Sequence, residues 1–272
     1  MKNLAWIIHI AILLALPVSL SAMPLVDIEA AIGGWQQSPS GYFSYDSDDR
    51  LDLESLLNYQ DEKQLFGRLK IDMPLVIPNI YLMASPMEFQ EKAVTDYLYR
   101  FGDLVVPPGV WFQSKLVLDQ YDVGLYYDIP LLKTATLNRL NIELGLNARI
   151  YDAEASVATI PPPVGVDIDD LELTDILDEY GQESEQETIL VPMIYLGIQI
   201  QPIEKLAFEG EFRGATYQDS DLYSLIGRVK VKAIGPFFFG GGYRYEAGDS
   251  HDWDLEFDVD FEGPFLEAGV SF

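Results

Sequence analysis

Residues 140–151 read LNIELGLNARIY, and apolar side chains in this stretch alternate strictly with polar or small ones. On an extended chain, Leu140, Ile142, Leu144, Leu146, Ala148 and Ile150 fall on one face, opposite Asn141, Glu143, Gly145, Asn147, Arg149 and Tyr151. This alternation predicts a strand with one greasy and one polar face. Such a strand occurs both in membrane barrels and in soluble sandwiches whose apolar face packs on the core. The rest of the sequence is needed to distinguish the two.

The same alternation recurs along the chain. The other segments are 25–37, 65–73, 79–90, 114–129, 189–201, 206–217, 222–233, 236–247 and 253–272. Together with 139–152 they make ten, an even number, as expected for a single-chain barrel. The sequence therefore predicts an all-β fold: a transmembrane antiparallel up-and-down β-barrel of about ten strands, with a range of roughly 8–12.

The N-terminus reads as an export signal. Lys2 is followed by an apolar run over 4–16 and by the small-residue stretch 19–22. The run is shorter than the roughly 20 residues of a spanning helix, so it favours a cleaved signal peptide over an anchor. We expect residues 1–22 to be removed near Ser21 or Ala22, and 23–272 to form the barrel in the bacterial outer membrane.

The composition narrows the function. The chain has 17 basic and 44 acidic residues, a net charge of −27, and no cysteine. The charge disfavours nucleic acid as a partner, because a phosphate backbone needs a basic surface. The missing cysteine excludes a lipoprotein anchor, disulfides and c-type haem attachment. We expect no cofactor, and we expect outer-membrane lipid and lipopolysaccharide around the protein.

Connections alternate in length, and the long ones are expected outside the cell near 38–64, 91–113 and 153–188. The last segment is the hardest to interpret. Its apolar residues change parity at Gly263–Pro264, which suits a bulge or a turn. We favour one long bulged strand whose upper half projects above the membrane; the alternative is a hairpin.

The polar face of the predicted strands carries charges of both signs. The candidates for a charge network in the lumen are Arg68, Lys70, Asp122, Glu143, Arg149, Glu209, Glu211, Arg213, Arg228, Lys230, Arg244 and Glu246. A barrel of about ten strands is narrow and largely filled by its own side chains. The network is therefore interpreted as structural, and a narrow path for ions or small solutes stays the alternative.

The apolar face of the strands predicts two further sets of functional residues. Aromatic girdles at the membrane surfaces are predicted from Trp35, Tyr121, Tyr127, Phe237 and Tyr245. The closing octapeptide 265–272 has apolar residues at alternate positions and a terminal aromatic. It looks like the signal that the barrel-assembly machinery recognises, with Phe265, Ala268, Val270 and Phe272 as its expected residues.

Two alternatives for function rest on the loops. Acidic residues crowd 167–187, which contains no basic residue, and hard divalent cations prefer oxygen ligands. The mature chain has one histidine, His251, in an Asp-Ser-His-Asp stretch. Opposite Asp46 and Asp48 it resembles the site of the omptin proteases, where a carboxylate-oriented histidine would activate water. A mobile acidic loop and a solvated histidine are the default interpretations, so we expect no enzyme.

Several short pieces resemble, in their order, the small Gram-negative outer-membrane β-barrel proteins with a Gly-Gly motif. The matching pieces are Gly33–Trp35, Pro74–Asn79, Leu125–Asp128, Leu144–Arg149, Val191–Tyr195 and Asp260–Phe265, followed by Phe272. The resemblance covers most of the mature chain and implies a barrel without an established activity. The sequence thus predicts an integral outer-membrane barrel with an envelope-structural or narrow-pore role.

Overall fold

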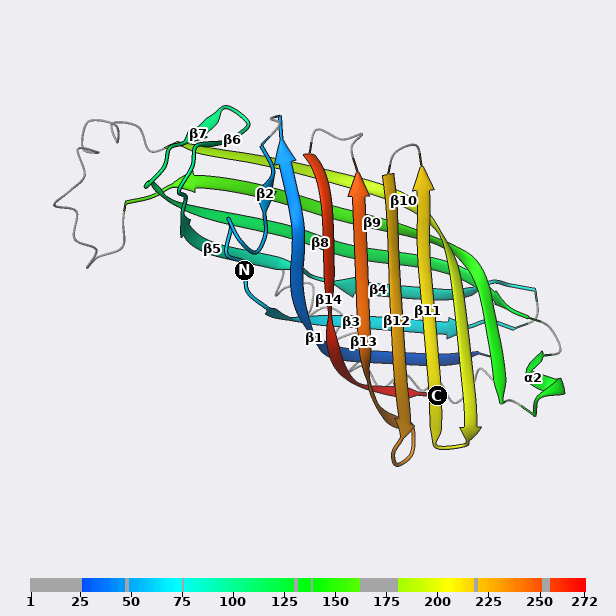
Figure 1. Cartoon of the computed structure of the whole chain (residues 1–272). Coiled ribbons are helices and arrows are strands. Elements are labelled where there is room, and N and C mark those ends of the chain that lie inside the picture. Colours follow the sequence, from blue (N-terminus) through cyan, green and yellow to red (C-terminus); the bar gives the residue numbers. More distant parts are fainter. Residues whose placement is uncertain are drawn as a thin grey trace.

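The computed structural model describes residues 26–46, 49–74, 76–129, 132–137, 139–161, 181–217, 220–250 and 255–272. Within these ranges the chain is almost entirely strand (Figure 1). The long strands are β1 (Asp27–Tyr45), β3 (Glu62–Asp72), β4 (Asn79–Ser85), β5 (Glu88–Val94), β8 (Trp111–Asp128), β9 (Leu140–Thr159), β10 (Gln182–Ile203), β11 (Leu206–Tyr217), β12 (Ser220–Lys232), β13 (Phe237–Ser250) and β14 (Leu255–Ser271). The short elements are β2 (Leu51–Asp52), β6 (Tyr99–Phe101), β7 (Leu104–Val106) and α2 (Leu132–Ala135). No helix among these residues is long and apolar enough to cross a membrane.

The sheet closes on itself. Apart from β4 and β5, consecutive long strands pair antiparallel, and β14 pairs with β1 to complete the ring. In Figure 1 the blue β1 lies beside the red β14. Both β4 and β5 pair with β8, so they occupy one position, and the barrel has ten strands. The predicted ten-strand antiparallel barrel is confirmed. Closure matters because it gives the edge groups of every strand a partner without water.

The last segment is one continuous strand, without the predicted bulge. The register of β14 with both β1 and β13 is unshifted across Gly263 and Pro264. Val259, Phe261 and Phe265 all face the interior, so the parity does not change either. A Cβ on Gly263 would collide with the carbonyl oxygen of Gln36, which explains the glycine. The hairpin alternative is also wrong.

The two ends of the barrel differ. At the turn end, the connections are 73–78, 129–139, 204–205 and 233–236, and the backbones of Ile28 and Phe272 hydrogen-bond at 2.9 Å and 3.2 Å. At the loop end, the connections are 46–61, 95–110 and 160–181, with shorter ones at 218–219 and 251–254. The strands therefore extend further than predicted into 38–64, 91–113 and 153–188. The predicted signal peptide, residues 1–22, lies outside the described residues.

Apolar side chains fill the lumen at the loop end. Phe89 of β5 and Phe261 of β14 stack with ring centroids 5.5 Å apart. Two connections fold inward onto this cluster and contribute Leu51, Leu53, Leu57, Tyr59, Tyr99, Phe101 and Val110. The mouth of the barrel is thereby occupied by a packed core of the kind found in a soluble protein.

The β6–β7 hairpin bridges the mouth. The amide of Gly102 donates to the carbonyl of Tyr45 on β1 at 2.9 Å. On the far side, a Cβ at Gly102 or at Gly181 would meet Glu183 or Leu104, so the hairpin also touches the start of β10. Strands β1 and β10 stand five places apart in the ring of ten, directly opposite each other. The hairpin therefore contacts both of these strands at the loop end.

Candidate functional site: the charged lumen

Below the apolar core the lumen is lined by charge. All twelve residues listed as candidates from the sequence have side chains in ion pairs there: Arg68, Lys70, Asp122, Glu143, Arg149, Glu209, Glu211, Arg213, Arg228, Lys230, Arg244 and Glu246. The sequence reasoning missed Glu29 and Glu267. Each lies between two apolar neighbours in the sequence, and that alternation was the signal that could have found it.

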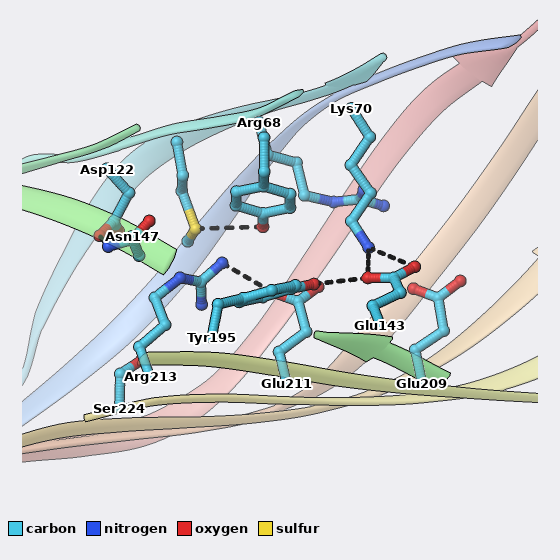
Figure 2. Close-up of polar contacts among 12 residues, drawn as sticks. Arg68, Lys70, Asp122, Glu143, Asn147, Tyr195, Glu209, Glu211, Arg213 and Ser224 are labelled. Carbon is cyan, nitrogen blue, oxygen red and sulfur yellow. Dashed lines mark hydrogen bonds and ion pairs between the residues drawn. The ribbon is translucent and has the colours of Figure 1, made fainter. Parts of the chain in front are cut away.

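The layer nearest the turn end contains side chains from six strands. Lys230 of β12 binds Glu29 of β1 at 2.9 Å and also binds Glu209 of β11. Lys70 binds Glu143 at 2.9 Å, and Glu143 also accepts the hydroxyl of Tyr195 at 2.7 Å (Figure 2). Lysine and glutamate side chains that are far apart in the sequence thus tie the walls together across the lumen.

The next layer is built around two arginines. Arg68 makes two hydrogen bonds to the carboxylate of Glu267, at 2.7 Å and 3.0 Å, and a third to Glu29 at 2.7 Å. Arg228 reaches three carboxylates, those of Glu209, Glu211 and Glu267, at 2.9 Å, 2.8 Å and 3.0 Å. The forked geometry of guanidinium suits such shared, two-point binding better than the single ammonium of lysine would.

Arg213 occupies the middle of the lumen. It binds Glu211 at 3.0 Å, and its guanidinium carbon lies 4.7 Å from the ring centre of Tyr81 and 5.2 Å from that of Tyr195. Figure 2 shows Arg213 beside Tyr195, with Asp122 and Asn147 farther along the lumen. Ring faces attract a desolvated cation, so the two tyrosines stabilise the part of the guanidinium that no carboxylate reaches.

The layer under the apolar core links opposite walls. Arg149 binds Asp122 through two nitrogens, at 2.8 Å and 3.0 Å, and Glu246 at 2.6 Å. Arg244 also binds Glu246 at 2.6 Å and crosses the lumen to Ser85 at 2.7 Å.

Trp35 corrects one of the girdle predictions. Its side chain is only 1% exposed and lies inside the barrel, with its ring 4.3 Å from the guanidinium carbon of Arg244. The girdle prediction for this residue is wrong, because the cation that attracts the ring comes from β13, which is remote in the sequence.

The lumen charges balance. The cations are Arg68, Lys70, Arg149, Arg213, Arg228, Lys230 and Arg244, and the anions are Glu29, Asp122, Glu143, Glu209, Glu211, Glu246 and Glu267, seven of each. Burying charge is costly unless every ion keeps close partners, and here each has at least one. The chain's net charge of −27 therefore resides outside this network. Chemically, the arrangement is suited to holding the walls in register.

The outer surface of the same strands is apolar. Exposed large apolar residues there include Ile32, Leu65, Leu82, Val123, Leu125, Leu144, Leu146, Ile194, Leu196, Ile198, Ile200, Phe208, Leu225, Val229, Val231, Phe239 and Leu266. They form a belt around a closed barrel whose interior is charged, which is the reverse of a soluble protein and is stable only in lipid. The chain is an integral β-barrel protein of the bacterial outer membrane.

Of the other predicted girdle residues, Tyr121, Tyr127 and Phe237 are exposed on this outer surface, and Tyr245 is partly exposed there. Among the four residues of the predicted insertion signal, Phe265 faces the lumen, where its ring lies 5.7 Å from that of Phe66. Ala268 and Phe272 are exposed and Val270 is partly exposed. Recognition of these residues by the assembly machinery stays a prediction.

The loop alternatives fall mostly beyond the described part of the chain. His251 and Asp48 lie outside the described residues, as do 167–180 of the acidic loop. Asp46 is described and has a left-handed backbone, with φ 44°. Among the described residues, no group of three or more histidine, cysteine or acidic side chains is arranged to hold a metal ion.

Comparisons with known proteins supplied no family. No family model matches the chain, and no curated relative matches it. The outer-membrane protease OmpT of Escherichia coli is 10% identical with a TM-score of 0.46, over 92% of this chain and 97% of that one. The translocator domain of the autotransporter NalP from Neisseria meningitidis is 12% identical with a TM-score of 0.42, over 100% and 97%. Ail, the attachment invasion locus protein of Yersinia pestis, is 8% identical with a TM-score of 0.33, over 91% and 99%. These likenesses concern the fold alone.

Proposed function

We propose that this protein is a non-conducting and non-enzymatic barrel with a structural role in the outer envelope. One observation carries the proposal: the lumen is filled twice over, by the ion-paired layers and by the apolar core above them. A solute would have to displace both, and the cross-lumen pairs of Arg149 and Arg244 are at hydrogen-bonding distance. The long connections would face outward from the cell, as is usual for such barrels.

Three predictions from the sequence go beyond the fold and are part of this proposal. Membership of the Gly-Gly family remains a prediction. Contacts with lipopolysaccharide, and with divalent cations through the acidic loops, remain predictions as well. Among the neighbours, OmpT is a protease by name, but the likeness to it is too distant to transfer an activity.

Conductance across planar lipid bilayers tests the proposal. Purified wild-type protein should insert and leave the current at baseline, because both fillings block the lumen. A variant in which 95–110 is replaced by a short glycine-serine linker should also stay closed, since the ionic layers remain. Adding Arg149→Ala and Arg244→Ala to that replacement should still leave the current at baseline, because the ion pairs of Arg68, Arg213 and Arg228 remain deeper in the lumen. Stable single-channel steps from the wild-type protein would contradict the proposal.

The structural role in the envelope can be tested by the sensitivity of cells to detergent and to EDTA. Cells lacking the protein should become more sensitive to detergent and to EDTA, which removes the cations that bridge lipopolysaccharide. Expression of the wild-type chain should restore resistance. A variant with Arg149→Ala and Arg244→Ala, inserted at equal abundance, should restore it less, because its barrel walls are held together by fewer ion pairs.

A further inference from the structure

A polar cavity of about 530 Å³ opens at the turn end of the barrel. Its inner wall is formed by Lys70, Glu143, Glu209 and Glu211, and its rim by Asp27, Lys205, Lys232 and Phe272. Both ends of the described chain lie at its mouth. The volume falls within the range of sites that hold small molecules, which is about 300–1,000 Å³.

The cavity is blind. Beyond its inner wall stand Arg68, Arg228 and Glu267, whose side chains are 0–1% exposed and bound to one another. The groups that face the cavity keep some contact with solvent: the side chain of Lys70 is 15% exposed and that of Glu143 is 10% exposed. A solute would therefore enter and leave by the same opening, so the cavity is a pocket and not part of a passage.

Among the carboxylates that line this cavity, those of Asp27 and Glu204 are exposed, and one of the partly buried carboxylates differs from the rest. Glu29 and Glu209 are both paired with Lys230, and Glu143 is paired with Lys70. Asp72, at the end of β3, has no ion pair with any described residue and accepts a hydrogen bond from the hydroxyl of Tyr126 at 2.7 Å. The nearby ammonium of Lys133 is bound at 2.6 Å to Asp128 instead.

We infer that this cavity binds a small solute carrying a primary ammonium group, which is placed against Asp72. An ammonium supplies the charge that Asp72 lacks and up to three donors, while Tyr126 holds the carboxylate in position. The amides of Gln199 and Gln201 and the ammonium groups of Lys230 and Lys232 line other parts of the cavity and suit a carboxylate or hydroxyl on the same solute. The inference goes beyond the structural role.

The test is isothermal titration calorimetry on the purified full-length barrel in detergent at physiological salt. The probes are ethanolamine and L-alanine, which carry an ammonium, and acetate, which does not. Ethanolamine and L-alanine should bind, and acetate should bind much more weakly. Asp72→Asn keeps an oxygen for Tyr126 but removes the charge, so it should weaken both ammonium probes by about tenfold or more.

The matched control is Asp103→Asn, which makes the same change in charge in the β6–β7 hairpin at the loop end. It should leave every affinity unchanged. Heat-modifiable migration on a gel verifies that each variant is folded. Absence of binding by both ammonium probes, equal binding of acetate, or full affinity in Asp72→Asn would each overturn the inference. Full affinity in Asp72→Asn that is lost in Asp103→Asn would assign the binding to the acidic loop end instead.

Discussion

The two halves of the barrel are made from the same strands but have opposite chemistry. Toward the turn end, side chains facing outward are apolar and those facing inward are charged. Toward the loop end, the outward face is polar and the inward face is aromatic or aliphatic. Strand β14 shows both halves in one run: its outward residues are Glu256, Asp258, Asp260 and Glu262 and then Pro264, Leu266 and Ala268, while Phe257, Val259 and Phe261 face inward before Phe265 and Glu267.

The difference shows that the surrounding solvent, and not the strand itself, determines which face of the strand is apolar. In lipid the outer face must be apolar and polar groups gather inside. In water the apolar groups move inside and drive packing as in any soluble domain. A single barrel can thus be a membrane protein at one end and a soluble β-structure at the other, and each half is held by a different force.

Removing one buried arginine should have the largest effect. Arg149→Met leaves Asp122 and Glu246 without their shared cation, and both carboxylates are almost fully buried. A loss of roughly 3–5 kcal/mol in the free energy of unfolding is expected, because an unpaired buried charge is severely penalised. Urea unfolding of the protein in lipid vesicles, followed by tryptophan fluorescence, measures it.

The control for that prediction is Lys115→Met, which removes a pair with Glu154 that is 3.3 Å long and about one third exposed. It should cost less than about 1 kcal/mol, since solvent screens such pairs. Equal losses in the two variants would mean that the lumen network does not hold the membrane half together.

The apolar half should respond in a different place. Phe261→Ala removes the ring that stacks on Phe89. It should cost about 3 kcal/mol through lost burial and a residual cavity. Hydrogen exchange should rise over 49–61 and 95–110, which pack on this cluster, and stay slow in the strands around Arg68 and Glu267.

Phe237→Ala is the matched control, because this phenylalanine lies on the outer surface and is 57% exposed. It should leave exchange in those two connections unchanged. If Phe261→Ala instead raised exchange uniformly along the whole barrel, the two halves would be one cooperative unit and the comparison above would fail.

The membrane half was largely readable from the sequence, because its alternation is local. Parity along 140–151 or 222–233 is enough to assign Arg149 or Arg228 to the interior. The partners of these residues could not be predicted, since Arg149 meets Glu246 across the lumen from a strand 97 residues away. Pairing across a closed barrel depends on shear and register, which no single segment encodes.

The sequence misled where the solvent changes along one strand. In β14 the apolar residues move from odd to even positions at Gly263 and Pro264, and this change of position predicts a bulge. The chain instead keeps its parity while the strand passes from water into lipid. The prediction for Trp35 was wrong because its contact lies on another strand. An aromatic residue near a membrane surface is typical of a girdle, but this ring lies inside the barrel against the guanidinium of Arg244.

The boundary between the halves can be located on β14 with two outward residues that share a face. Leu266 is 74% exposed on the belt, so Leu266→Arg should cost about 2 kcal/mol, the lower part of the range for arginine facing lipid. Glu262→Arg, four residues earlier, should cost close to nothing if that position lies in water or among headgroups. Unfolding from vesicles measures both. The substitutions introduce the same side chain on the same strand and the same face, so their difference isolates depth in the membrane. Two equal costs would place Glu262 in the hydrocarbon as well. The outward carboxylates of Glu262, Asp260 and Asp258 would then face lipid, which contradicts a loop-end half that stands in water.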